Sequence, residues 1–488
     1  LNTVRLSHYP QSQHFLNRCD ELGLLVFDEI PGWQHIGEKG EWWDITTQHV
    51  REMITRSWNH PSIFIWGVRI NESEDCDELY RETSRIAKFL DDTRPTGGVR
   101  CGKNSNLLED VYTFNDFVHS GSNHALDKPK DVIGHDAPYL VTEHNGHMYP
   151  TKRFDSQEMR LEHALRHMRV LDSAYGQENH GGAIGWCMFD YNTHKDFGSG
   201  DRICYHGVMD MFRLPKYAAA TYASQQNDRP YMEVASNMRM GDYPASELGH
   251  VYVMTNCDFI KLYKNDTFIQ EFYPARDKFP SVPHAPIIID NFIGNLIEEN
   301  ESFSKSDCRM LKEILIEVTR VGLEGLSLMH KLKMLFLLKK NGMSLDDGVA
   351  LYGKYIGGWG EESTTFRIEG YKDGKLVCEQ SRGQSFEQRL DVNVDCGELV
   401  EAETWDTTRI TVERRDEDNC VMPYASDALS IETEGPIEVI GPRVISLIGG
   451  GVAFWVKTTG QTGEARIKIH TQEFGVIVKT VQVTKTAA

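Results

Sequence analysis

Short apolar runs alternate with longer amphipathic segments over the first 225 residues. The runs are five or six residues long and rich in Val, Ile and Phe, which is typical of strands. The segments between them repeat apolar residues at helical spacing, most clearly over 42–58 and 78–92. This alternation predicts parallel strands joined by crossover helices, as in a (β/α)8 TIM barrel. The predicted strands are 2–7, 24–28, 63–67, 97–101, 110–114, 138–142 and 183–188, seven where a closed barrel needs eight.

Beyond Pro230 the pattern changes to alternating strands and turns, which predicts β-sandwich (Ig-like) domains. Hairpin turns are expected at 264–266 and 372–374. Helical periodicity interrupts the strands at about 305–356, where Ser344 and Asp347 have the spacing of a capping box. We therefore predict a barrel over 1–225, a β-sandwich with a helical insertion over 226–396 and a second sandwich over 397–488. Three domains also suit 488 residues at about 150 residues per domain.

Composition excludes several classes of function. The net charge of −20 disfavours nucleic acid and anionic membranes as partners. The longest apolar stretches, near 325–338 and 444–456, are too short or too interrupted to span a bilayer. The ten cysteines are dispersed, with no CxxC pair, which favours a reducing and hence cytoplasmic compartment, with periplasmic or secreted locations left open. No phosphate-binding loop or serine-hydrolase elbow occurs.

Polar residues follow most of the predicted barrel strands. The carboxyl ends of barrel strands meet at one mouth, so these residues are the candidates for chemistry. Two carboxylates follow buried apolar runs, Glu72 after IFIWGVRI and Glu143 after APYLVT. A pair of carboxylates at one mouth suits hydrolysis of a glycosidic bond, although a single strand-end carboxylate is often only a helix cap or an ion-pair partner. The other candidates are Arg5, His8, Asn71, Asn115, His147 and Trp186.

Two long motifs match a known family. The first is NTVRLSHYP at 2–10, followed by GLLVF at 23–27, and the second is WNHPSIFIWGVRINE at 58–72. Both resemble the signatures of glycoside hydrolase family 2, the family of β-galactosidases, β-mannosidases and β-glucuronidases. Leu6 and Ser57 depart from the usual residue types. The resemblance is strong over about 1–225. The predicted sandwiches resemble those of the family only in their general character.

The resemblance implies a role for each candidate. Glu72 would be the general acid and base, and Glu143 the nucleophile that Arg5 keeps anionic. Family members retain the anomeric configuration, which requires carboxyl groups about 5 to 5.5 Å apart. Asn71 would donate to the sugar 2-hydroxyl, His8 and His147 would bind other hydroxyls, and Trp186 would form an apolar floor. Asn115 is a pocket candidate, while the tyrosine that many members place near the nucleophile has no counterpart, since Tyr112 lies too early.

The sequence favours a neutral sugar. Glucuronidases of the family use an Asn-x-Lys motif to bind the substrate carboxylate, and no such motif occurs in this chain. Lys195 lies in the corresponding loop, but its neighbour Asp196 suggests a structural partner. A β-galactoside is the expected substrate, with a β-mannoside as an alternative. No cofactor is expected, and no metal, because Glu143 to His147 lacks the i, i+4 histidine pair of a zinc helix.

The start at Leu1 suggests a second hypothesis. Family members carry a sugar-binding sandwich, an Ig-like domain and a first barrel strand before the point that corresponds to Leu1. The expectation is a truncated C-terminal portion, with an open gap between the first and last barrel strands. Such a chain would be catalytically incompetent or a carbohydrate-binding remnant, and of low stability. A homo-oligomer is left open.

Overall fold

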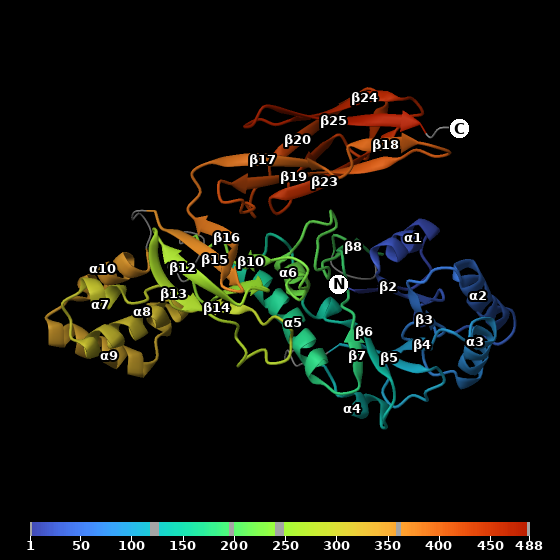
Figure 1. Cartoon of the computed structure of the whole chain (residues 1–488), viewed down its shortest axis with the longest axis horizontal. Helices are drawn as coiled ribbons and strands as arrows, with labels where there is room; N and C mark the ends of the chain where they lie inside the picture. Colours follow the sequence, from blue (N-terminus) through green and yellow to red (C-terminus); the bar gives the residue numbers. More distant parts are fainter. Residues whose placement is uncertain (1, 118–125, 195–199, 240–247, 358–362, 486–488) are drawn as a thin grey trace.

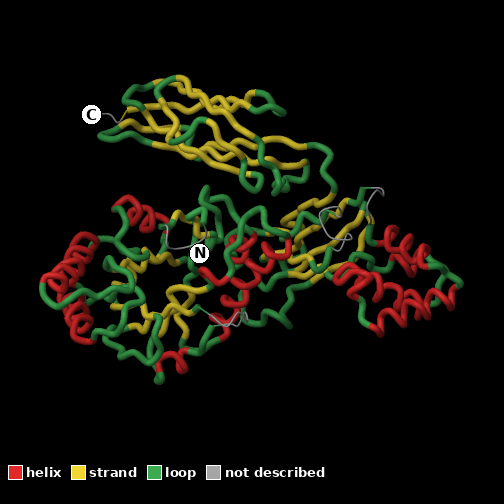
Figure 2. Tube along the Cα trace, turned by 180° about the vertical axis from the view of Figure 1, so that it is seen from behind, coloured by secondary structure: helices red, strands yellow, loops and turns green. Residues whose placement is uncertain are grey.

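The computed structural model describes residues 2–117, 126–194, 200–239, 248–357 and 363–485. Figure 1 shows three parts. A parallel sheet with helices around it occupies one end, a second β-rich part with a cluster of helices occupies the other end, and a sandwich built by the last fifth of the chain lies across both. The view from behind in Figure 2 shows the same arrangement.

The first part is built on a seven-stranded sheet whose strands lie in chain order and pair in parallel. The strands are β1 (Thr3–Leu6), β2 (Leu25–Glu29), β3 (Ile63–Gly67), β4 (Thr96–Arg100), β5 (Val111–Asp116), β6 (Tyr139–His144) and β7 (His180–Ala183). This confirms the prediction of a (β/α)8-type barrel with seven strands. The last strand is displaced from the predicted 183–188, since regular pairing ends at Ala183 and Trp186 forms only a single bridge with Asn145.

Helices cover the outside of this sheet, and one further helix follows its last strand in the chain. They are α1 (Gln13–Leu22), α2 (Glu41–Ser57), α3 (Asp77–Leu90), α4 (Pro129–Ile133), a 3-10 turn at Gly146–Met148, α5 (Gln157–Gly176) and α6 (Tyr217–Ala223), with the small strands β8 (Tyr191–Asn192) and β9 (Ile203–Cys204) between the last two helices. The predicted helices at 42–58 and 78–92 are confirmed as α2 and α3. Ser12 and Ser156 cap α1 and α5 by accepting backbone N–H bonds, which satisfies donors that a helix start leaves unpaired.

Alternation along the strands separates the two faces of the sheet. Val26 and Trp66 point outward and pack with α2 and α3, while Phe27, Ile65 and Val99 form a small core on the inner face. Along β2 the next inward position after Phe27 is Glu29, at the carboxyl end. Because every second residue of a strand faces inward, the interior of the sheet is apolar and a charged side chain lies above it at the mouth. The two edge strands are the most exposed, as β1 and β7 are only partly buried.

The middle part joins two antiparallel sheets. They contain β10 (Met232–Val234), β11 (Val251–Thr255) and β14 (Ile287–Ile289) in one, and β12 (Phe259–Lys264), β13 (Thr267–Phe272), β15 (Thr365–Lys372) and β16 (Lys375–Gly383) in the other. Both predicted hairpin turns are confirmed. Asn265, Asp266, Asp373 and Gly374 take the positive φ that a tight hairpin needs.

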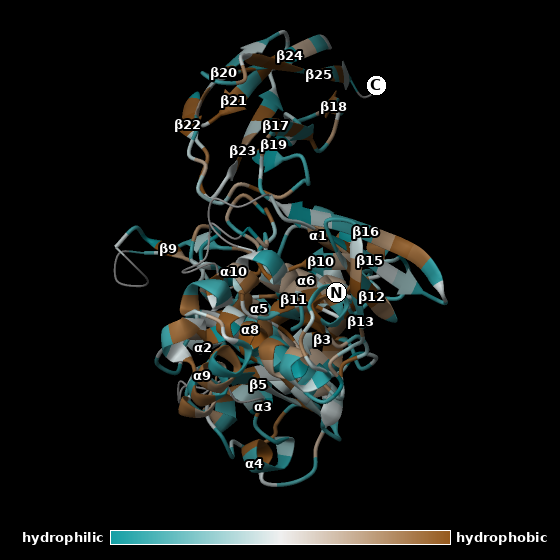
Figure 3. Cartoon of the chain, turned by 90° about the vertical axis from the view of Figure 1, so that its left-hand side faces the viewer, coloured by the Kyte–Doolittle hydropathy of each residue, from teal (hydrophilic) through white to brown (hydrophobic). Residues whose placement is uncertain are grey.

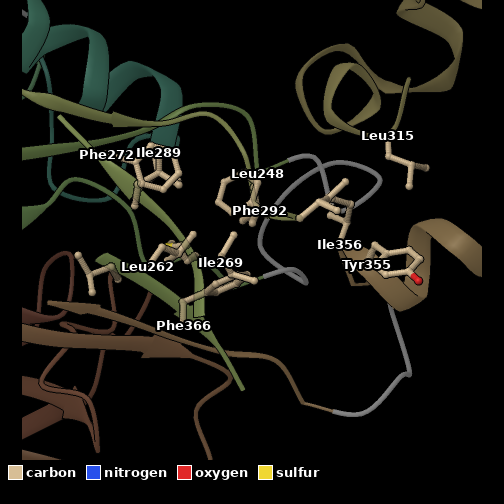
Figure 4. Packing of buried hydrophobic residues seen from close by; sticks show 14 of the residues in the cluster. Leu248, Leu262, Ile269, Phe272, Ile289, Phe292, Leu315, Tyr355, Ile356 and Phe366 are labelled. Atoms are coloured by element: carbon tan, nitrogen blue, oxygen red, sulfur yellow. The ribbon is translucent and has the colours of Figure 1, made fainter. Parts of the chain in front are cut away.

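The predicted helical insertion is also confirmed, between β14 and β15. It consists of α7 (Leu296–Asn300), α8 (Lys305–Gly325), α9 (Leu328–Asn341) and α10 (Leu345–Tyr355). Ser344 and Asp347 form both bonds of the capping box. Figure 4 shows how the insertion is anchored, since Leu315, Tyr355 and Ile356 belong to the same apolar cluster as Ile269 and Phe366 of the sheet.

The C-terminal part is a sandwich of two sheets. One contains β17 (Gln388–Val394), β19 (Thr407–Asp416), β21 (Ile437–Ile440) and β23 (Gly451–Thr458), and the other contains β18 (Glu398–Glu401), β20 (Ala428–Glu434), β22 (Val444–Ser446), β24 (Gly463–His470) and β25 (Val476–Lys485). Because β17 pairs with β19, this sheet begins before residue 397. Arg153 joins it to the barrel through a 2.8 Å ion pair with Glu413. Among the described residues, no helix has the length and apolarity to cross a membrane.

Candidate active site

Charged and amide side chains from several strands converge at the carboxyl end of the barrel sheet. Arg5 lies near the end of β1, Glu29 ends β2, Asn71 and Glu72 follow β3, Asn115 lies near the end of β5, and Glu143 near the end of β6. Hydrogen bonds join these side chains into one network. The structure thus brings together the two carboxylates, the arginine and both asparagines that the sequence analysis selected.

A β-bulge turns Glu143 toward this network. The pairing of β5 with β6 runs regularly to Phe114 and Val141, and the next partners are Asn115 and Glu143, so Thr142 is skipped. Simple alternation after Val141, which packs on the helix side, would send Glu143 outward as well. The extra residue reverses the alternation, which is a common use of bulges next to functional sites. Glu143 then faces inward and His144 faces α5.

Arg5 holds two buried carboxylates at once. Its guanidinium donates through Nε and Nη2 to both oxygens of Glu29, at 3.1 and 2.8 Å, and through Nη1 to Oε1 of Glu143 at 2.5 Å. The side chains of Arg5 and Glu29 are 2% and 1% exposed. Nη2 also donates to Oδ1 of Asn71 at 2.9 Å. The planar fork of an arginine suits such simultaneous contacts, which a lysine cannot reproduce.

Glu72 sits at the outer side of the same network. Its Oε1 accepts a bond from Asn115 at 3.0 Å, and its Oε2 accepts bonds from the Trp33 indole and the Gln34 amide, each at 3.2 Å. Gln34 and Glu72 both have positive φ, a backbone region that side chains other than glycine seldom occupy. The Gln34 N–H donates to the Asn71 carbonyl at 2.8 Å, which fixes the loop against Glu72.

Asn71 and Asn115 connect the two carboxylates. Oδ1 of Asn71 accepts from Arg5 on one side and from Asn115 on the other, at 2.9 and 3.3 Å. Thr142 donates to Oδ1 of Asn115 at 2.9 Å and fixes the orientation of that amide. The amide nitrogen of Asn71 is buried and makes no hydrogen bond within the described residues. It is therefore a donor at the site that a ligand hydroxyl can satisfy.

Burial and the nearby positive groups act in opposite directions on the pKa of Glu143. Removal from water raises the pKa of Glu143, and the charge of Glu72 acts in the same sense, while Arg5 and His8 oppose both. Burial by itself would lower the pKa of Arg5, but Glu29 and Glu143 together outweigh it and raise this pKa, so the guanidinium stays charged. The two candidate carboxylates are near enough to influence each other, and Arg5 favours the anionic form of Glu143.

Aromatic rings form a wall beside the carboxylates. His8 stacks on Trp186 with ring centres 5.4 Å apart and an angle of 12° between the planes. The Trp186 indole donates to the Tyr191 hydroxyl at 3.3 Å. His147, which is exposed, lies against Phe117 with centres 5.3 Å apart. The structure thus places the predicted sugar-binding rings in pairs, whereas Tyr112 lies in the core and Lys195 and Asp196 fall outside the described residues.

Four contributors to the network were not among the selected site residues: Glu29, Trp33, Gln34 and Thr142. Glu29 had a sequence signal, because it lies two positions after Phe27 on the same face of a strand. Trp33 and Gln34 belong to a loop whose path depends on backbone pairing with Asn71. Neither that pairing nor the bulge that admits Thr142 has a local signature in the sequence.

Comparison with known proteins agrees with this geometry. Residues 1–228 match the family model "Glycosyl hydrolases family 2, TIM barrel domain". Residues 1–228 belong to glycoside hydrolase family 2. The match covers the seven-stranded sheet and its helices, including each member of the hydrogen-bonded network.

Several curated relatives extend the similarity over most of the chain. A β-galactosidase of Thermoanaerobacterium thermosulfurigenes is 44% identical over 92% of this chain and 55% of its own length. A β-galactosidase of Thermoanaerobacter pseudethanolicus is 38% identical over 98% of this chain and 57% of its own length. The chain therefore spans about half the length of these relatives.

Solved structures share the fold at low identity. A family 2 β-glucuronidase has a TM-score of 0.67 with 18% identity, over 100% of this chain and 45% of its own. A β-glycosidase from Bacteroides vulgatus has a TM-score of 0.65 with 17% identity, over 99% of this chain and 59% of its own. The family 2 barrel and the β-rich parts after it thus have a known arrangement.

Behind β6, the barrel buries a cluster of histidines. His144 follows Glu143 and lies near His167 of α5, with ring centres 5.6 Å apart, and His163 lies 5.0 Å from His167. His167 shares a 2.8 Å hydrogen bond with the Tyr222 hydroxyl. Burial lowers the pKa of His144 and of His163 to about 3, and lowers that of His180 in β7 to about 4.

These histidines should make the barrel sensitive to acid. In the unfolded chain they bind protons near pH 6.5, whereas the folded barrel keeps them neutral down to about pH 3 to 4. The contribution of these neutral histidines to the free energy of unfolding is therefore fully present above about pH 6.5. Below it, the free energy of unfolding falls by up to about 1.4 kcal/mol per pH unit for each histidine.

Urea unfolding of His163→Leu between pH 4 and 7 measures this slope. We expect a shallower pH dependence than in the unmodified chain. His14→Leu, at an exposed position, serves as the matched control and should leave the slope unchanged. Equal slopes for all three proteins would show that the buried cluster does not govern the acid response.

Proposed function

We propose that this chain hydrolyses terminal β-D-galactosides with retention of the anomeric configuration. The observation that carries the proposal is the continuous network from Glu143 through Arg5, Asn71 and Asn115 to Glu72. It holds two carboxylates at one mouth of a family 2 barrel. Glu143 accepts a hydrogen bond from the charged Arg5, and Glu72 accepts hydrogen bonds from neutral N–H donors. Different surroundings suit two carboxylates to different tasks.

In the first step, the Glu143 carboxylate attacks the anomeric carbon. The bond from this carbon to the leaving oxygen breaks, and the Glu72 carboxyl group gives its proton to that oxygen. The product is an ester between the sugar and Glu143. The positive charge of Arg5 lowers the energy of the anion before attack, and the bulge at Thr142 aims it into the mouth.

In the second step, Glu72 acts as a base. It takes a proton from a water molecule whose oxygen attacks the anomeric carbon, the ester bond breaks, and Glu143 is released as a carboxylate. Two inversions at one carbon give net retention. The unpaired amide nitrogen of Asn71 is placed to donate to a sugar hydroxyl during both steps. His8, His147, Trp186 and Asn115 complete the proposed sugar-binding wall.

Removal of Arg5 should destabilise the barrel strongly. Arg5→Met leaves Glu29 and Glu143 buried without their shared cation, which costs about 3 to 5 kcal/mol of unfolding free energy. The double variant Arg5→Met, Glu29→Gln should recover part of this loss, because one of the two unpaired charges is gone. Urea unfolding followed by tryptophan fluorescence measures both. If the second substitution added to the loss, the ion-pair explanation would fail.

The galactose assignment rests on the curated relatives and on the absence of an Asn-x-Lys motif from the sequence. A panel of p-nitrophenyl β-glycosides tests it. We expect the highest kcat/KM on the galactoside, with lower values on the mannoside and the glucuronide. A higher kcat/KM on the mannoside would be consistent with the proposed mechanism but would identify a β-mannoside as the substrate. Hydrolysis of no member by a folded chain would favour the carbohydrate-binding alternative.

A further inference from the structure

Glu29 is a buried carboxylate that the proposed reaction does not use. It ends β2, its side chain is 1% exposed, and both of its oxygens accept hydrogen bonds from Arg5. Figure 3 shows hydrophobic segments in the interior of each part of the molecule and hydrophilic segments mostly along the outside. An anion at this depth is costly, and Glu29 shares the cation of Arg5 with a second anion, Glu143. A carboxylate in this place therefore affects both Arg5 and the proposed nucleophile.

Each N–H group of the Arg5 guanidinium has an acceptor. Nε donates to Oε2 of Glu29 at 3.1 Å, and Nη2 donates to Oε1 of Glu29 at 2.8 Å and to Oδ1 of Asn71 at 2.9 Å. Nη1 donates to Oε1 of Glu143 at 2.5 Å, and its other contact is the Thr142 carbonyl at 3.5 Å. Glu29 thus occupies the fork formed by Nε and Nη2, which is the geometry of a bidentate pair. Glu143 is left with a single hydrogen bond from Nη1.

The two oxygens of Glu143 are therefore unequal. Oε1 is held by Arg5, whereas Oε2 has no hydrogen-bond partner among the described residues. A carboxylate oxygen without a donor keeps its lone pairs for attack on the anomeric carbon, while a guanidinium fork that binds both oxygens makes both less reactive. If the charge of Glu29 were absent, Glu143 would be the remaining anion bonded to Arg5, and the fork would turn toward it. The presence of Glu29 prevents this rearrangement.

We propose that Glu29 is a positioning residue, which takes the fork of Arg5 so that one N–H holds Oε1 of Glu143 and Oε2 stays free to attack. The inference rests on the proposed function, in which Glu143 is the nucleophile. Glu29 also offsets part of the charge of Arg5, because it is a second negative group on the same cation. The other titratable groups that act on Glu143 are His8 and Glu72. Nδ1 of His8 lies 3.3 Å from Oε1 of Glu29 and 3.2 Å from Nη2 of Arg5, so the same ion pair also orients this ring.

The pH dependence of kcat/KM on p-nitrophenyl β-galactoside tests the proposal. Without the charge of Glu29, Arg5 favours the anionic form of Glu143 more strongly, so in Glu29→Gln the loss of activity on the acid side should begin about one pH unit lower. Because both oxygens of Glu143 are then bound, kcat/KM at neutral pH should fall by roughly 10²-fold. Glu29→Asp keeps the charge and should keep the acid side of the profile at its original pH.

Glu109→Gln is the matched control for the pH profile. Glu109 is a fully buried carboxylate that pairs with Arg100 at the end of β4 and takes no part in the network at the mouth. Its replacement removes a buried negative charge from the same barrel and should leave the acid side of the profile in place. An unshifted profile in Glu29→Gln, whatever the loss of activity, would make Glu29 a merely structural residue and overturn the proposal.

Urea unfolding tests the sharing of Arg5 without any substrate. A chain that hydrolyses no aryl β-glycoside would refute the proposed function, and the unfolding measurement would still decide this inference. In the unmodified chain Arg5 keeps Glu29 when Glu143→Gln is made, so the unfolding equilibrium constant should not rise. In the Glu29→Gln background the same substitution leaves Arg5 without a bonded anion, and the constant should rise by about tenfold or more. Equal effects of Glu143→Gln in the two backgrounds would contradict the sharing and overturn the proposal.

Discussion

Glu143→Gln is expected to abolish turnover of an aryl β-galactoside, with a loss of roughly 10⁴-fold or more in kcat. The amide has nearly the shape of the carboxylate, but it cannot form the ester on which the first step depends. It also removes one of the two anions that Arg5 binds. Steady-state kinetics with p-nitrophenyl β-galactoside measures the loss, and circular dichroism verifies the fold.

A matched control and a rescue distinguish the nucleophile from a merely structural carboxylate. Glu38→Gln, at an exposed position of the loop after β2, should keep full activity. Glu143→Ala with added azide should regain turnover and yield the α-galactosyl azide, because the small anion attacks from the side that Glu143 vacated. A Glu143→Gln enzyme with unchanged turnover would exclude Glu143 as the nucleophile.

Glu72→Ala is expected to have an effect that depends on the leaving group. A substrate with a poor leaving group, such as lactose, needs the proton from Glu72, so its kcat/KM should fall by about 10² to 10⁴-fold. A dinitrophenyl galactoside leaves without a proton, so its kcat/KM should fall far less. Its second step still lacks a base, and we expect a burst of dinitrophenol followed by slow turnover.

The burst is the informative measurement for Glu72. Azide should accelerate the slow phase and give the β-galactosyl azide, since it then attacks on the side where water normally enters. Gln34→Leu is a milder comparison, as it removes only one of the three N–H donors to the Glu72 carboxylate. An equal loss on both substrates in Glu72→Ala would argue that this residue holds the site together rather than transferring a proton.

Much of the barrel was predictable because its signals are local. Apolar runs ended by polar residues defined the strands, and the parallel order then placed Arg5, Glu72 and Glu143 at one mouth. The capping box at Ser344 and the two hairpin turns are likewise short patterns with a direct geometric meaning. Two long sequence motifs indicated the family, and residues 1–228 match the model of its barrel domain.

The rest depends on pairings between distant segments. The inward aim of Glu143 comes from a bulge whose register is set by β5, and periodicity alone would send this side chain outward. The contact of Gln34 with Glu72 needs a loop held on the Asn71 carbonyl in a strained conformation. Arg5 was expected to serve one carboxylate and binds two, because Glu29 ends the neighbouring strand. The last strand ends early since its regular pairing with β6 stops at Ala183.

The stereochemistry of the first product tests the central claim most directly. Proton NMR spectra recorded within the first minutes of hydrolysis of an aryl β-galactoside identify the anomer before it equilibrates in water. Double displacement through Glu143 predicts that β-galactose appears first and the α anomer only later, by mutarotation. Initial release of α-galactose would mean a single displacement by water, and would contradict the assignment of Glu143 as nucleophile and Glu72 as acid and base.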